Sequence, residues 1–155
     1  MSVSVNKGEL YNSSCAIISS ILIAEKKTDE ARAILERSKD LECKYLLFHL
    51  FLNLDRPDIA EKVMKEMNSI DGDDILSQLA FSQLALVAGG DKAQEAFLTL
   101  SELIDRYTST PLLLNFLAIA QMKLARWDDA TKTLMESLEK VCFFPLIFPL
   151  LFLDQ

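Results

Sequence analysis

The feature that most constrains this chain is an alanine that recurs at the same place in four helical segments. These alanines are Ala31, Ala60, Ala96 and Ala130, with separations of 29, 36 and 34 residues. Each lies among apolar residues at steps of three and four, the spacing of one buried helix face. A generic helical bundle would share that spacing, but it would not be expected to repeat a small residue at one offset. We therefore favour structural repeats over a generic bundle.

The clearest repeat spans 110–140, TPLLLNFLAIAQMKLARWDDATKTLMESLEK. Thr110 is predicted to cap its first helix, with Pro111 at the first helical position. The predicted inner face of that helix is formed by Leu114, Leu117, Ala118, Gln121 and Leu124. The second helix is predicted to present Ala130, Leu134, Ser137 and Leu138 on one side. Two antiparallel helices in about 34 residues are typical of a tetratricopeptide repeat.

Comparable pairs are predicted at 12–39, at 40–68 and after the acidic turn 71–74. In the third pair Asp91 is predicted to cap the second helix, in a capping box with Gln94. The chain has four glycines and four prolines, and strand-type alternation is absent. The prediction is an all-α chain, a tetratricopeptide-like alpha-solenoid of about four helix-turn-helix repeats over residues 1–140.

Charge and cysteine content exclude several classes of function. The formal net charge is −7, and Lys and Arg are scattered among acids, which argues against nucleic acid and against direct binding to an anionic membrane. Cys15, Cys43 and Cys142 are far apart and odd in number. They predict a reducing compartment and no disulfide framework.

Residues that could support catalysis are sparse. The one histidine, His49, lies in the apolar segment LLFHLFL, where a core or groove-lining residue is more common than a catalyst. No Cys/His cluster has metal-ligand spacing, and no glycine-rich loop follows a strand. We therefore predict that the chain is not an enzyme and that it has no catalytic residue, no metal site and no cofactor.

The function is instead expected to come from the concave face, which the first helix of each repeat would line. Matching offsets place seven candidate partner-binding residues there: Tyr45, His49, Phe81, Leu84, Asn115, Ile119 and Met122. A moderately apolar face with a few polar groups suits an extended or helical protein segment. The alternative is that several of these residues only pack against neighbouring repeats.

A second alternative is a generic tetratricopeptide adaptor of the co-chaperone type, which clamps the C-terminal carboxylate of a peptide. That clamp needs several Lys, Arg and Asn side chains on the inner face, and only Asn115 fits.

The C-terminal segment 141–155, VCFFPLIFPLLFLDQ, contrasts with the repeats. It has no charge before Asp154 and contains Pro145 and Pro149. It is too short for a membrane-spanning helix, which needs about 20 residues. We interpret this tail as an artefact of gene prediction or expression rather than an anchor. Because both ends of the array are apolar, the chain is expected to aggregate or form oligomers at micromolar concentration.

Several stretches resemble the epsilon subunit of coatomer, the COPI vesicle coat. They are KDLEC (39–43), NLDRPDIAEKVMKEM (53–67), DDILSQLA (73–80), LVAGGDKAQEAF (86–97) and the repeat at 110–140. The resemblance implies a central-to-C-terminal portion of that family, with the family's N-terminal repeats absent and the tail 141–155 atypical of it.

The resemblance further implies a structural subunit that is not an enzyme. It would bind the C-terminal region of the coatomer alpha subunit, alongside other coatomer subunits, and support Golgi-to-ER retrograde and intra-Golgi vesicle transport. The protein would be cytoplasmic and peripheral on Golgi membranes and COPI-coated vesicles, reaching the membrane only through the coat.

Overall fold

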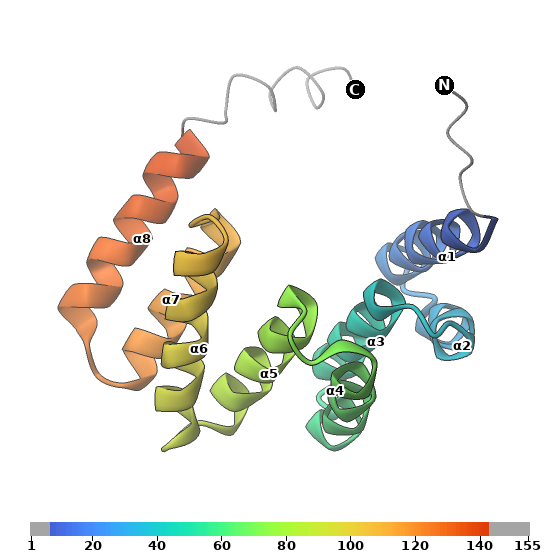
Figure 1. Ribbon diagram of the computed structural model, residues 1–155, viewed down its shortest axis with the longest axis horizontal. Coiled ribbons are helices and arrows are strands. Elements are labelled where there is room, and N and C mark those ends of the chain that lie inside the picture. Colours follow the sequence, from blue (N-terminus) through green and yellow to red (C-terminus); the bar gives the residue numbers. More distant parts are fainter. Residues whose placement is uncertain (1–6, 143–155) are drawn as a thin grey trace. The chain divides into compact units, whose positions relative to one another are not determined.

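The computed structural model describes residues 7–142, with side chains from Ser14 to Val141. Over this range the chain forms helices only (Figure 1). In chain order the eight helices are α1 (Lys7–Ala24), α2 (Thr28–Arg37), α3 (Leu41–Asn53), α4 (Pro57–Asp71), α5 (Ile75–Ala88), α6 (Lys92–Arg106), α7 (Pro111–Lys123) and α8 (Trp127–Cys142). The predicted number of helices is confirmed. None of these described helices combines the length and the apolar character needed to cross a bilayer.

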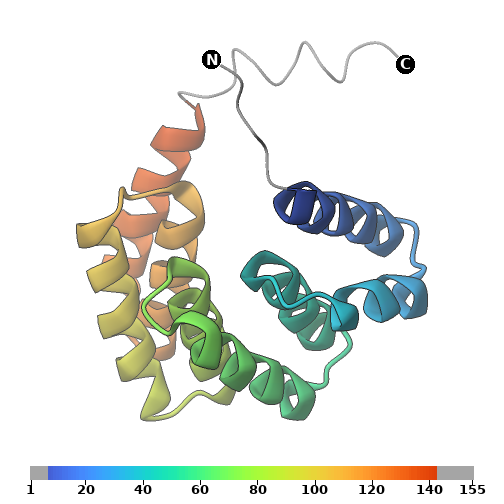
Figure 2. The same cartoon turned by 45° about the vertical axis from the view of Figure 1, so that its right-hand side comes forward.

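The chain divides into two compact units, and the division falls within α5, after Leu84. In unit 1, α1 packs against α2 and α3 against α4, and α3 also contacts α1 and α2. In unit 2, α7 packs against both α6 and α8. The two helices of the blue pair, α1 and α2, lie side by side in both views, and so do the two helices of the orange-to-red pair, α7 and α8 (Figures 1 and 2). Three of the four predicted helix pairs are therefore present, α1–α2 and α3–α4 in unit 1 and α7–α8 in unit 2.

The four repeated alanines of the second helices are all buried: Ala31 on α2, Ala60 on α4, Ala96 on α6 and Ala130 on α8. Ala80 on α5 and Ala118 on α7 are buried as well. A methyl side chain lets two helix backbones approach, whereas a larger one would hold them apart. The repeat register that the sequence predicts is thus the one that the structure adopts.

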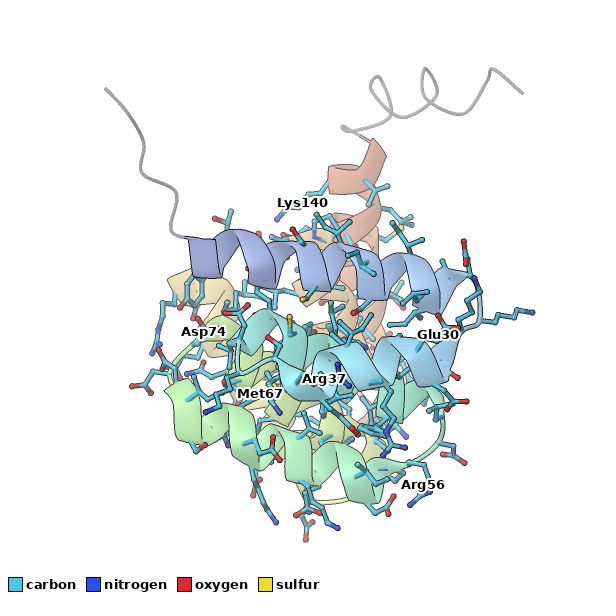
Figure 3. The ribbon with its side chains drawn as sticks, turned by 90° about the vertical axis from the view of Figure 1, so that its right-hand side faces the viewer. Glu30, Arg37, Arg56, Met67, Asp74 and Lys140 are labelled. Atoms are coloured by element: carbon cyan, nitrogen blue, oxygen red, sulfur yellow. The ribbon has the colours of Figure 1, made fainter. Side chains whose placement is uncertain are left out.

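The core of unit 1 is built around Phe48, the largest side chain that is fully buried. Met67, which Figure 3 labels on α4, is also fully buried. The cluster comprises Cys15, Leu35, Cys43, Leu47, Phe48, Leu50, Phe51, Ala60, Val63, Met64, Met67 and Ala80. Its members come from α1 to α5, so the first two helix pairs share one core.

Side-chain hydrogen bonds fasten α7 to α8 in unit 2. Thr133 donates its hydroxyl to Oε1 of the buried Gln121 at 2.9 Å. Ser137 donates to Oδ1 of Asn115 at 2.9 Å and to the Pro111 carbonyl at 3.3 Å. Because buried polar groups need partners, these bonds fix how α8 lies along α7.

A lysine ties the connection before α7 to the end of α8. Lys140, labelled in Figure 3, donates its ammonium to the Ser109 carbonyl at 2.9 Å and also to the Ser109 hydroxyl. The same ammonium pairs with Glu136 at 2.9 Å. A cation in the last turn is favourable for a helix, because the carbonyl groups there carry partial negative charge.

Three connections between paired helices share one backbone geometry. After α7, Ala125 has φ 58°, its N–H bonds the Met122 carbonyl, and the next N–H, of Arg126, bonds the Gln121 carbonyl. The same two bonds follow α1, around Lys26 (φ 63°), and α3, around Asp55 (φ 55°). This is the Schellman helix stop, which usually has glycine at the left-handed position.

The connection between α5 and α6 differs from the other three. It uses two glycines, Gly89 (φ 69°) and Gly90 (φ 61°). Both adopt left-handed conformations, which glycine reaches without the steric cost that a Cβ atom imposes. This accounts for the LVAGGD sequence between α5 and α6.

The predicted helix caps are partly confirmed. The Thr110 hydroxyl accepts a hydrogen bond from the Leu113 N–H at 3.3 Å, with Pro111 at the first helical position, as predicted. The capping box at Asp91 is wrong. Asp91 has helical dihedral angles (φ −60°, ψ −27°) and makes no side-chain cap bond. A capping side chain needs a residue outside the helical region, so its geometry is not available there.

Candidate partner-binding site

Two of the predicted partner-binding residues lie one turn apart on α3. The rings of Tyr45 and His49 meet edge to face, with centroids 4.8 Å apart. Gln83 on α5 donates its amide N–H to the Tyr45 hydroxyl at 2.9 Å. Tyr45 also stacks on Phe48 of the core, at 6.2 Å between centroids. The structure therefore brings Tyr45 and His49 together and anchors both to the core of unit 1.

These two side chains form an uncharged surface at neutral pH. Burial lowers the pKa of His49 below its ordinary value, which favours the neutral imidazole. Burial raises the pKa of the Tyr45 phenol, and this effect exceeds the opposing effect of the hydrogen bond from Gln83. A neutral ring among aromatic rings is suited to apolar contact and to hydrogen bonding.

The two candidates on α5 have a structural role in unit 1. Phe81 and Leu84 are half-buried and pack against the core cluster, as Tyr45 does. Any substitution there will therefore change stability as well as the exposed surface. Phe81 and Leu84 therefore show packing within the repeats, which the sequence left open as an alternative to partner binding.

Gln83, which bonds to the candidate residue Tyr45, is not in the predicted set. It is buried, and its amide oxygen has no hydrogen-bond partner in the described part of the chain. The sequence does contain a signal for it, because Gln83 occupies the same repeat position as Gln121. In unit 2 the Gln121 side-chain oxygen accepts a hydrogen bond from the Thr133 hydroxyl. The two glutamines thus occupy the same repeat position but bond to different partners, Tyr45 for Gln83 and Thr133 for Gln121.

The remaining candidates lie on α7, in unit 2. Ile119 is 37% exposed, Met122 is half-buried and Asn115 is exposed. Leu112 lies on the same face of α7, seven residues before Ile119, and is 55% exposed. Helical spacing alone could have added Leu112 to the set. The α7 part of the site is thus a mostly apolar surface with one amide.

The polar group of this surface is already engaged. The Asn115 side-chain oxygen accepts a hydrogen bond from the Ser137 hydroxyl, which leaves the amide N–H₂ as the group that it can offer.

Near the α3 candidates, the mostly buried Lys44 pairs with Glu66 at 2.8 Å. A carboxylate clamp would require cations that are free to turn toward a ligand, and this lysine is held by its own chain.

The candidate residues therefore fall into two groups, one in each unit. Unit 1 contains Tyr45, His49, Phe81 and Leu84, whereas unit 2 contains Asn115, Ile119 and Met122. Among the side chains described, no three His, Cys, Asp or Glu residues gather as metal ligands would. Both groups present apolar surface with a few neutral polar groups.

Solved structures with a similar fold are repeat proteins. A tetratricopeptide repeat protein from Parabacteroides merdae superposes with a TM-score of 0.67, at 14% identity, over 81% of this chain and 50% of that one. MamA from Desulfovibrio magneticus gives a TM-score of 0.61, also at 14% identity, over 88% and 76%. The predicted all-α fold of tetratricopeptide-like repeats is confirmed.

Similar curated sequences are epsilon subunits of coatomer. Coatomer subunit epsilon-1 of Arabidopsis thaliana is 33% identical over 124 residues, which are 80% of this chain and 42% of the relative. The Dictyostelium discoideum subunit is 34% identical over 125 residues, with the same coverage. Epsilon-2 of Oryza sativa subsp. indica is 42% identical over 89 residues. The chain spans less than half the length of these relatives.

A model of one family matches the whole described part of the chain. That family is described as the coatomer epsilon subunit, and the match runs over residues 4–142. It covers all the candidate residues and stops at the start of the segment that the sequence marks as atypical. The chain belongs to the coatomer epsilon subunit family.

Proposed function

We propose that this chain acts as a structural subunit of the COPI vesicle coat, without enzymatic activity. In this role it binds the C-terminal region of the coatomer alpha subunit and supports Golgi-to-ER retrograde and intra-Golgi transport. It is then cytoplasmic, and peripheral on Golgi membranes and COPI-coated vesicles through the coat. The observation that carries this proposal is the family match over residues 4–142.

The candidate residues give the proposal a physical basis. His49 and Tyr45 offer neutral aromatic surface that is anchored to the core. On α7, Ile119 and Leu112 expose apolar side chains on one helix face. A protein segment can bury such surface, at about 25 cal/mol for each Å² of apolar area removed from water. The formal net charge of −7 does not favour direct binding to anionic lipid, which attracts clusters of Lys and Arg.

A binding assay with the purified C-terminal region of a coatomer alpha subunit tests the proposal. Isothermal titration of the full chain is expected to show a one-to-one complex. Ile119→Ala removes exposed apolar surface, so we expect it to weaken that complex by about tenfold, which is about 1.4 kcal/mol. Ile119 is 37% exposed, so its truncation also removes some packing and should lower the melting temperature modestly while leaving the chain folded at the assay temperature.

Leu98→Ala is the matched control. Leu98 is an exposed aliphatic residue in the same unit, on α6 and outside the candidate set, and its truncation should leave affinity unchanged. Equal losses in the two variants would show that Ile119 is not a contact. No complex with the unmodified chain would contradict the proposal itself. Binding of a peptide only through its free C-terminal carboxylate would favour the co-chaperone type of adaptor.

A further inference from the structure

Two polar residues of the candidate set occupy the same repeat position in different helices. Tyr45 on α3 and Asn115 on α7 each begin the matching series of inner-face candidates on their helix. In both residues the side-chain oxygen already accepts a hydrogen bond from the same chain. Gln83 donates its amide N–H to the Tyr45 hydroxyl oxygen at 2.9 Å, and the Ser137 hydroxyl donates to Asn115 Oδ1 at 2.9 Å.

Each of these two side chains is left with an unused donor. A phenol has one O–H hydrogen and a carboxamide has two N–H hydrogens. Because the Tyr45 oxygen receives a hydrogen from Gln83, its own O–H points away from that amide. Within the described part of the chain, neither the Tyr45 O–H nor the Asn115 N–H₂ donates to another group. The same repeat position therefore offers a hydrogen-bond donor in each unit.

The Tyr45 hydroxyl is held in place by three contacts. Its ring stacks on Phe48 and meets His49 edge to face, and Gln83 bonds its oxygen. Gln83 is 4% exposed, and its amide oxygen finds no partner among the described residues, so losing Tyr45 would leave a buried amide unpaired. A side chain that is already ordered loses little conformational entropy when a partner binds it.

The third repeat shows a structural residue at the same position. Ser77 on α5 is fully buried, and its hydroxyl donates to the Asp71 carbonyl at 2.6 Å. Its donor is therefore used within the chain. Tyr45 is half-buried and Asn115 is exposed, so both of these side chains reach the surface with their donors unused.

We propose that Tyr45 and Asn115 are the hydrogen-bond donors through which this face recognises its partner, and that Gln83 positions Tyr45. The partner groups that fit are neutral acceptor oxygens, namely carbonyl groups of a protein segment. A carboxylate fits less well, because the chain has a formal net charge of −7. This inference rests on the proposed function, since the segment is the C-terminal region of a coatomer alpha subunit.

Isothermal titration of the full chain with that region tests the two donors. Tyr45→Phe removes only the hydroxyl, and one neutral hydrogen bond is worth about fivefold in affinity, so we expect about a fivefold loss. Asn115→Asp replaces only the N–H₂ group and keeps Oδ1 as the acceptor for Ser137. We expect it to weaken the complex more than tenfold, because its negative charge also faces an acceptor oxygen.

Two exposed residues outside the candidate set provide matched controls. Tyr107→Phe removes a hydroxyl from a tyrosine that is 42% exposed. Asn68→Asp makes the same amide-to-carboxylate change at an exposed asparagine of α4. Both control variants should bind as the unmodified chain does.

A double variant separates recognition from stability. Tyr45→Phe leaves the buried Gln83 amide unpaired, so its melting temperature should fall. Tyr45→Phe combined with Gln83→Met removes both polar groups at similar volume, so stability should return while affinity stays low. Gln83→Met alone keeps a hydroxyl that is no longer positioned, and it should weaken the complex about twofold. Affinity that returns together with stability would show that Tyr45 has only a structural role and would overturn the proposal.

Ionic strength tests the nature of the acceptor. For a neutral carbonyl, the ratio of the two affinities, unmodified chain to Tyr45→Phe, should be the same in about 0.05 M and about 0.5 M salt. A ratio that falls toward one at high salt would indicate a carboxylate and would contradict a neutral acceptor.

The results distinguish these donors from the coat function itself. If the unmodified chain forms the complex and either Tyr45→Phe or Asn115→Asp keeps full affinity, the donors are wrong and the coat function stands. Equal losses in the control variants would also overturn the donors. No complex with the unmodified chain overturns both.

Discussion

Replacing Ala130 by glutamate tests the packing of α8 on α7, because it introduces a larger and ionisable side chain at a buried position. Ala130 is 2% exposed, and Ala118 of the facing helix α7 is 0% exposed. The larger side chain has no space between two closely packed backbones, and its carboxylate would be placed out of water. Two separate costs follow, one from volume and one from ionisation.

The two costs can be estimated separately. Overpacking a close helix contact costs about 1–3 kcal/mol. A carboxyl group that must stay protonated at pH 7, against an ordinary pKa of about 4.3, costs about 3.7 kcal/mol more. The expected total for Ala130→Glu at pH 7 is therefore about 5–7 kcal/mol. That is as large as the whole stability of many domains.

Only the ionisation cost depends on pH. Between pH 7 and pH 5.5 the cost of keeping the carboxyl protonated falls by about 2 kcal/mol, because each pH unit is worth about 1.36 kcal/mol. The variant should therefore recover stability relative to the unmodified chain as the solution is acidified. Ala130→Gln has nearly the same volume without an ionisable group, so its cost should be the same at both pH values.

Urea unfolding of the three proteins at pH 7 and pH 5.5, followed by circular dichroism, measures both costs. A variant too unstable to fold at pH 7 would still be scored by its recovery at pH 5.5. The reasoning is refuted if Ala130→Glu costs less than about 1 kcal/mol, a value typical of an average substitution. It is also refuted if glutamate and glutamine variants respond equally to pH, since Ala130 would then be solvated.

Three further predictions concern the cap, the histidine and a helix stop. Thr110→Ala removes the cap of α7 and should cost about 1 kcal/mol in urea unfolding, whereas Thr110→Ser should cost little; equal losses would mean that the hydroxyl does not act as a cap. Burial lowers the pKa of His49 from 6.5, so below pH 6.5 the unfolded chain takes up a proton that the folded chain resists, and stability should fall. His49→Gln should reduce the loss of melting temperature between pH 7.5 and pH 5.5, and an unchanged loss would assign it to other groups. Ala125→Gly should stabilise by about 1 kcal/mol in thermal unfolding, because Ala125 has φ 58°, and a lower melting temperature would argue against that strain.

The helical architecture could be predicted because its determinants are local. Apolar steps of three and four residues identify helices, and a small residue at one offset identifies the register. The Thr110 cap was predictable for the same reason, since a hydroxyl followed by proline defines a helix start within a few residues. The prediction at Asp91 failed because this residue, which follows two left-handed glycines, already has helical dihedral angles.

The extent of burial could not be predicted in the same way. Periodicity shows which face of α8 is apolar, but it does not show whether a neighbouring helix covers that face. Leu134 and Leu138 were predicted on one side of their helix with Ala130 and Ser137, and the structure buries Ala130 and Ser137 but leaves the two leucines exposed. The bond from Gln83 to Tyr45 joins residues 38 positions apart, and no local pattern contains that information.

The three Schellman stops have a consequence for comparing members of this family. Lys26, Asp55 and Ala125 have no side-chain chemistry in common, yet each ends a first helix with the same pair of backbone bonds. An alignment guided by residue identity has nothing to match at these positions. A left-handed dihedral angle followed by a new helix can serve instead as a boundary marker for each repeat. With such markers, repeats could be placed in register between chains that are only one-third identical, as this chain and its relatives are.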